Sequence, residues 1–185
     1  MKSAGAILKK VLRDHIQGLV TAGTLPNALD CQVTDGPQPT SFGIMFVAIH
    51  NARHKNAAPE GAAYDRQIWS VDVTISMMST HVPRDRILEG VDTITDAMDL
   101  IGQIIAQSIS HNYTILATAN ATIDTDADFV TGIPLAVGEV SDIEPQHAEF
   151  FNASMDKPKK PESRQPTGYS KTLTLSGAER YIPHY

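Results

Sequence analysis

The stretch that decides the expected fold is YDRQIWSVDVTISMMS, residues 64–79. Within the segment from about residue 67 to residue 77, apolar and polar side chains alternate strictly from residue 69 onward. The apolar set is Trp69, Val71, Val73, Ile75 and Met77. The polar set is Ser70, Asp72, Thr74 and Ser76. Because successive side chains of a strand point to opposite faces, this pattern predicts a long strand with its apolar face on a core and its polar face in water.

A second strand is expected just before it. Residues 42–50, FGIMFVAIH, form a continuous apolar run, which is typical of a strand covered on both faces. The segment between the two strands, NARHKNAAPEGAA at residues 51–63, is small, polar and broken by Pro59 and Gly61. We therefore expect a long antiparallel hairpin with a protruding loop at residues 51–63.

Two helices are expected on either side of this hairpin. Residues 3–22 carry apolar side chains three and four positions apart, and Gly23 is placed to end that helix. The second helix is predicted from Pro83 to about residue 109. One apolar stripe runs along it: Ile87, Val91, Ile94, Met98, Ile101 and Ile105. Its other face is acidic, which predicts an amphipathic helix lying on the sheet.

The remaining sequence predicts short strands. We expect strands at residues 113–118 and 132–140, the latter at an edge because Pro134 cannot donate to a ladder. Residues 171–176, KTLTLS, alternate again and could form a final strand or an arm. The predicted fold is α+β: a mostly antiparallel sheet with two helices packed on one face, in the order α-β-β-α-β-β plus a C-terminal extension. Residues 1–150 would form the core domain and residues 151–185 a Pro- and Lys-containing extension with a possible final strand.

Composition limits the classes of function. The chain has 185 residues and a formal net charge of -6, which argues against a general nucleic-acid binder. Its single cysteine, Cys31, excludes an internal disulfide and zinc sites built on paired cysteines. No apolar run approaches the length of a membrane span, and Lys9, Lys10 and Arg13 interrupt the N-terminal one. We therefore expect synthesis in the cytoplasm and no association with a membrane.

The sequence contains no common catalytic motif, so we expect no enzyme activity, catalytic residue, metal or cofactor. Asp124, Asp126 and Asp128 match the start of a calcium loop. However, Phe129 stands where the loop needs glycine and Leu135 where it needs glutamate. A solvated acidic turn is the preferred interpretation.

The candidate functional residues are instead contact residues in two basic clusters. The first is on the predicted loop and the following strand: His50, Arg53, His54, Lys55 and Arg66. The second is on the extension: Lys157, Lys159, Lys160 and Arg164. The first cluster suits an acidic partner surface or passing DNA, although a plain solvated loop would show the same residues. The second suits an arm that orders on a neighbouring subunit, although a soluble linker would show the same residues.

A family resemblance rests on the central segment. Residues 64–79 lead, after a short break, into VPRDRILEGVDTITDAMDLIGQIIAQSI at residues 82–109. The order of elements is an amphipathic helix, a strand, an alternating strand with an aromatic-rich start, and a long helix with an apolar stripe. This pattern resembles the tail-terminator and tail-completion (neck) proteins of tailed bacteriophages. The resemblance spans about residues 3–142 and rests on pattern and element order.

The resemblance implies a structural virion protein without catalysis. It implies a homo-oligomeric ring, usually of six subunits, at the head-proximal end of the tail. Such a ring caps the tail tube, joins it to the neck or connector, and lets DNA pass through its channel without sequence-specific binding. Three alternatives stay open: another head–tail connector or minor tail subunit, a small soluble enzyme using His50, Asp72 or His111, and a binding module of host metabolism.

Overall fold

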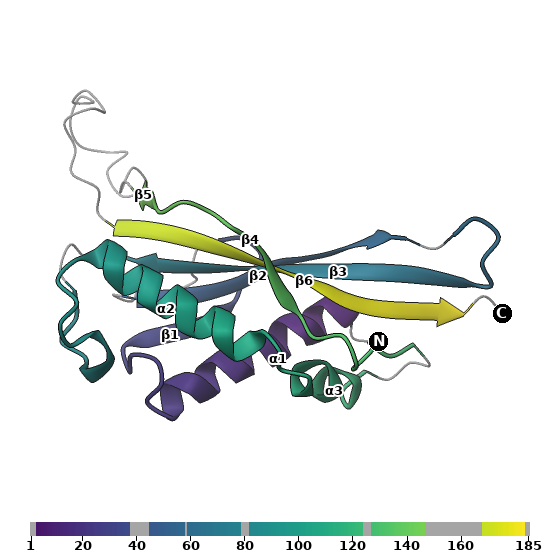
Figure 1. Cartoon of the computed structure of the whole chain (residues 1–185), viewed down its shortest axis with the longest axis horizontal. Coiled ribbons are helices and arrows are strands. Elements are labelled where there is room, and N and C mark those ends of the chain that lie inside the picture. Colours follow the sequence, from purple (N-terminus) through teal and green to yellow (C-terminus); the bar gives the residue numbers. More distant parts are fainter. Residues whose placement is uncertain are drawn as a thin grey trace, which may run out of the picture.

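The computed structural model describes residues 3–37, 45–57, 59–78, 82–123, 127–146 and 168–183. It shows three helices packed against a six-stranded sheet (Figure 1). The helices are α1 (Ala4–Thr21), α2 (Ile94–Ile109) and α3 (Thr114–Asn120), and a short 3-10 turn η1 (Arg86–Leu88) precedes α2. The strands are β1 (Leu29–Val33), β2 (Met45–Asn56), β3 (Tyr64–Met77), β4 (Ala136–Val140), β5 (Glu144–Gln146) and β6 (Gly168–Pro183).

The sheet is mixed but mostly antiparallel. Its order is β1-β2-β3-β6-β4, and β5 pairs with β6 beside β4. Among the described strands, only β1 and β2 run parallel; the other pairings are antiparallel. The predicted α+β class and the helix-covered mostly antiparallel sheet are therefore confirmed.

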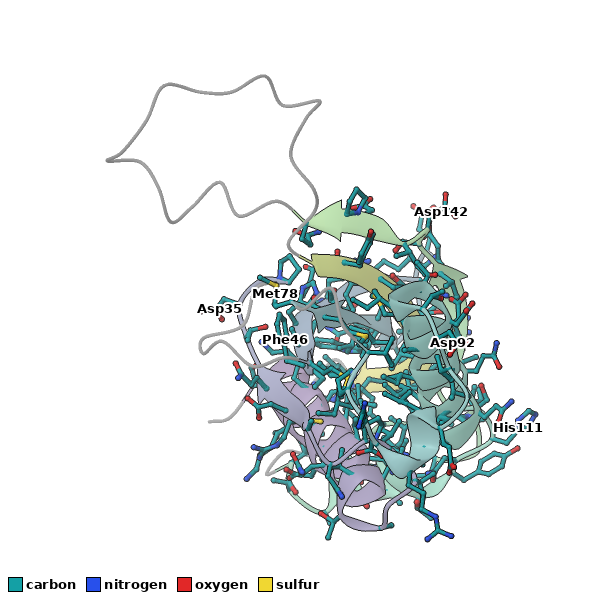
Figure 2. All side chains as sticks on the ribbon, turned by 90° about the vertical axis from the view of Figure 1, so that its left-hand side faces the viewer. Asp35, Phe46, Met78, Asp92, His111 and Asp142 are labelled. Atoms are coloured by element: carbon teal, nitrogen blue, oxygen red, sulfur yellow. The ribbon has the colours of Figure 1, made fainter. Side chains whose placement is uncertain are left out.

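The helices cover the face of the sheet to which the apolar residues of β3 point. Ile7, Leu8 and Leu12 of α1 and Ile101 and Ile105 of α2 are buried in one cluster with the apolar row of β3. The core occupies the space between sheet and helices in the end-on view (Figure 2). The predicted apolar face of β3 is thus confirmed as the core face.

Local capping explains where the first helix begins and ends. The Ser3 hydroxyl accepts a hydrogen bond from the Ala6 N–H. Gly23 has φ of 74°, and the Thr24 N–H donates back to the Leu19 carbonyl over 2.8 Å. These are the contacts of a Schellman motif with glycine in the left-handed position. The predicted helix over residues 3–22 is confirmed.

Three element predictions were wrong. The segment predicted as a strand at 113–118 is α3, because Ile115, Leu116 and Ala119 have helical spacing on a buried face. The second helix does not begin at Pro83. Gly90 has φ of 81°, which is not helical, and the Thr93 hydroxyl caps a helix that begins at Ile94. Residues 51–56 are not a loop but the continuation of β2.

The polar face of β3 is not in water, as the alternation had suggested. Asp72, Thr74 and Ser76 are all less than 10% exposed. Since β3 lies between β2 and β6, its polar side chains bond to side chains of both neighbours. The prediction of a solvated face was wrong because polarity there reflects hydrogen bonding across strands.

The last strand is longer and more central than the sequence indicated. Residues 171–176 lie within β6, which pairs with β3 from Tyr169 to Pro183 and with β4 and β5 on its other side. The division at residue 150 stays a prediction. The structure adds that residues 168–183 belong to the same sheet as the core.

We predict that Leu175→Ala lowers the free energy of unfolding by about 2–5 kcal/mol, because Leu175 is fully buried on the core face of β6. Urea denaturation followed by circular dichroism measures this. Val140→Ala, in a half-exposed position of β4, is the matched control and should cost less than about 1 kcal/mol. Equal effects of the two changes would contradict a central role for β6.

Candidate interaction surface

Three strands continue past the helices and form an arm. The arm comprises residues 53–56 of β2, 64–69 of β3 and 178–183 of β6, paired side by side. Figure 1 shows these strand ends extending beyond the helices toward the C-terminus. The arm therefore offers sheet surface that the helices do not cover.

Two β-bulges mark the joint between the arm and the body. The β2–β3 register shifts between His50 and Arg53, where Asn51 has φ of 51°. The β3–β6 register shifts between Trp69 and Ser70, opposite Gly177 at φ 102°. Bulges bend and twist a strand, so two of them at the same level set the direction in which the arm leaves the body.

The Asp72 carboxylate ties the three strands together at this joint. One oxygen accepts from Arg53 Nη1 over 2.7 Å and from Asn51 Nδ2 over 2.6 Å, both on β2. The other accepts from Thr174 Oγ1 on β6 over 2.8 Å. Burial alone would raise the pKa of Asp72, but these hydrogen bonds and the charge of Arg53 hold it below its usual range.

His50 belongs to the interior of the joint. Its Nε2 lies 2.8 Å from Thr74 Oγ1, which is in turn 2.8 Å from Thr172 Oγ1. The side chain is buried, and burial lowers the pKa of the imidazole. His50 was predicted as a contact residue on a loop; it is instead a buried strand residue that links β2 to β3.

Trp69 packs the joint from the helix side. Its ring centroid lies 4.6 Å from that of His54 and 6.3 Å from that of Phe129. A Cβ atom on Gly5 of α1 would come within 2.8 Å of the Trp69 ring. The glycine therefore lets α1 approach the indole closely, and any side chain there would push the two apart.

The face of the arm that points away from the helices carries aromatic and charged side chains. Tyr64 and Tyr181 are both 37% exposed and meet edge to face with centroids 5.2 Å apart. Arg66 donates to both oxygens of Glu179 over 3.1 and 2.5 Å. The Tyr181 hydroxyl donates to Glu179 over 2.8 Å, and the hydrogen bonds from Arg66 and Tyr181 lower the pKa of Glu179.

In the two ion pairs of this region, the arginine is exposed and the carboxylate is largely covered. The side chains of Asp72 and Glu179 are 11% and 12% exposed, whereas those of Arg53 and Arg66 are 47% and 35% exposed. Lys55 is exposed nearby on β2. The arm surface formed by Arg53, Lys55, Tyr64, Arg66 and Tyr181 is called the arm face below.

Four of the five predicted residues of the first basic cluster therefore lie on the arm: Arg53, His54, Lys55 and Arg66. The second cluster, Lys157, Lys159, Lys160 and Arg164, lies outside the described residues. Sequence reasoning missed Tyr64, Glu179 and Tyr181. The alternation of residues 171–176, extended toward the C-terminus, was the available signal for the last two.

An acidic surface lies on another part of the molecule. Residues 87–146 contain ten Asp and Glu and no Lys or Arg, so all 15 basic residues occur elsewhere, with 11 acids. Five of these carboxylates are exposed: Asp92 and Asp96 at the start of α2, and Glu139, Asp142 and Glu144 on β4, on β5 and in the loop between them. This set is called the acidic face. Asp92 and Asp142 lie on the same side of the molecule in Figure 2.

Other candidate sites are less developed. A pocket of about 470 Å³ is lined by the single segment Val82–Val91, with Arg84, Asp85, Arg86 and Glu89 but no serine, cysteine or histidine. Among the described residues, no three His, Cys, Asp or Glu side chains are grouped to hold a metal ion. Asp124 and Asp126 lie outside them. Burial raises the pKa of the Cys31 thiol to about 12, so it is a poor nucleophile.

Comparison with family models and with curated proteins gives no match for this chain. No helix within the described ranges is both long and apolar enough to cross a membrane. The functional argument therefore depends on the geometry of the arm, its joint and the acidic face.

We predict that Asp72→Asn lowers the free energy of unfolding at pH 7 by roughly 1.5–3 kcal/mol, because charge-assisted bonds to a covered carboxylate are lost. The pKa of Asp72 is lower in the folded state than its unfolded value near 3.9. Its contribution is present above that unfolded pKa and fades as the pH falls through the folded one. Urea melts at several pH values should show variant and wild type converging in acid.

Asp99→Asn is the matched control for this prediction. Asp99 pairs with Lys171 of β6 away from the joint and is about half exposed. The control should change stability little. In the Asp72→Asn protein, but not in the control, Trp69 fluorescence should shift to the red at pH 7. An unchanged Trp69 spectrum would contradict the assignment of Asp72 to the joint.

Proposed function

We propose that this chain is a non-enzymatic assembly subunit that forms a homo-oligomeric ring. The supporting observation is the arm, which extends beyond the helices and carries a preformed cluster of tyrosine and arginine side chains. Tyr and Arg are enriched among residues that dominate binding at protein interfaces. The ion pair with Glu179 holds Arg66 in place, so less side-chain entropy is lost on association.

The identity of the ring follows from the sequence resemblance. We propose a tail terminator of a tailed bacteriophage, located in the virion, that caps the tail tube and contacts neck or connector proteins. An α+β subunit with helices packed on a long-stranded sheet agrees with that proposal. The net charge of -6 would disfavour adhesion of DNA passing through a channel.

Two other functions make different predictions. Another head–tail connector or minor tail subunit would also assemble but would bind a different end of the neck. A small soluble enzyme or binding module would stay monomeric or dimeric. The pair that the enzyme hypothesis names, His50 and Asp72, lies opposite in register, yet each is bound into the sheet: His50 to Thr74, and Asp72 to Arg53, Asn51 and Thr174.

The test is the native mass of the purified protein by light scattering, followed by negative-stain images of the largest species. A ring of six 20.0 kDa chains would have a mass of about 120 kDa. Rings formed alone, or only after purified tail tubes are added, support the proposal. A protein that stays monomeric at high concentration and with tail tubes overturns it.

A further inference from the structure

We infer that the arm face of one copy docks on the acidic face of a second copy. This inference rests on the proposed self-assembly and adds the surfaces that make the contact. The partner is thus another molecule of this chain, bound head to tail.

Charge complementarity is the first argument. The arm face exposes Arg53, Lys55 and Arg66, while the carboxylates that pair with the two arginines are about 90% covered. The acidic face comes from a 60-residue stretch without any Lys or Arg. Its one neighbouring described cation in the sheet, Lys171, is already paired with Asp99. Opposite potentials across an interface steer association and select the correct partner.

Apolar side chains on the two faces also match. The arm face presents the Tyr64–Tyr181 pair, each ring 37% exposed. On the other surface, Val140 follows Glu139 in β4 and is 50% exposed, and Ile133 in the loop before β4 is 43% exposed. Interfaces commonly place such apolar contacts at the centre with charged residues around them. Tyrosine rings against Val140, ringed by ion pairs, would fit that arrangement.

The positions of the two faces define the symmetry of the contact. The arm face is on the outer ends of β2, β3 and β6, whereas the acidic face is on α2, β4 and β5. Because these are different surfaces, each copy can bind two neighbours. A contact of this kind repeats, and it closes into a ring when the rotation between copies divides the circle.

A second copy fits the arm face better than nucleic acid does. The strands of the arm also contain Asp65 and Glu179, and Glu60 is in the turn that connects two of them, so the basic surplus of the arm is small. A nucleic-acid site usually has a larger basic surplus. The acidic face would also repel a phosphate backbone.

The experiment uses two double variants of the full chain. The arm variant carries Lys55→Glu and Tyr64→Glu, and the face variant carries Asp142→Lys and Glu144→Lys; all four side chains are exposed. Each variant keeps one intact surface. We expect each alone to be monomeric at a concentration where the wild type assembles, and their equimolar mixture to form a 1:1 dimer and nothing larger.

Lys10→Glu, exposed on α1 outside both faces, is the control and should assemble like the wild type. Circular dichroism melts verify that every variant is folded. Light scattering reports mass, and fluorescence anisotropy of a labelled 30-base-pair duplex in 50 mM salt reports DNA binding.

The outcomes separate this inference from the proposed function. Variants that assemble normally overturn the docking model but leave the ring proposal standing. A mixture that stays monomeric also overturns it, because the intact arm face of one variant then fails to bind the intact acidic face of the other. If the wild type binds the duplex and only the arm variant loses this binding, the arm face is a nucleic-acid site and the inference is overturned. A wild type that never assembles overturns both proposals.

Discussion

The structure depends on one pairing, that of β3 with β6. These strands, from the middle and the end of the chain, stay in register from Tyr64 opposite Pro183 to Met77 opposite Tyr169, with one bulge between. Their inner halves supply the apolar row on which α1 and α2 pack. Their outer halves, with β2, form the arm. Without β6, β3 would lose half of its hydrogen bonds, and β4 and β5 would lose the strand to which they pair.

The joint between the arm and the rest of the sheet matters for the proposed function because it sets the direction of the arm. Two bulges bend the sheet, and a backbone with residues at positive φ needs support from its surroundings. Asp72 supplies it by bonding to β2 and β6 together, while Trp69 packs the opposite side against α1. A ring closes only when each copy is presented to the next at a fixed angle. We therefore regard a stiff joint as the property that would let a sheet extension serve as an assembly contact.

Sequence reasoning succeeded where a pattern was local. The period-two alternation at residues 69–77 predicted strand β3 and its core face, and the helical spacing at residues 3–22 predicted α1; both were confirmed. The alternation did not predict that the polar face of β3 is buried as well. Sequence reasoning failed at residues 113–118, where Thr and Ile suggested a strand. There, the Asn112 side chain accepts hydrogen bonds from the N–H and the hydroxyl of Thr114, the first residue of α3. The Asn120 side chain, at the end of α3, bonds to the backbone of Phe129. Helix α2 began later than predicted because the Thr93 cap and Gly90 outweighed the apolar stripe.

The candidate site was harder to predict because its partners are distant in sequence. Arg53 and Lys55 were found as a basic cluster, but the carboxylate of Asp72 is 19 residues from Arg53, and Glu179 is 113 residues from Arg66. Tyr64 meets Tyr181 only because β3 and β6 are paired. No local sequence pattern indicates which residues of β3 and β6 pair. The sequence therefore indicated which charges are available, and the fold determined which of them stay exposed.

The most direct test is zero-length carbodiimide cross-linking of an equal mixture of ¹⁴N- and ¹⁵N-labelled protein, read by mass spectrometry. The account predicts mixed-isotope peptides that join Lys55 on the arm of one copy to Asp142 or Glu144 of another. Cross-links from Lys55 that are found only within single chains, in a sample whose mass shows assembly, would contradict it.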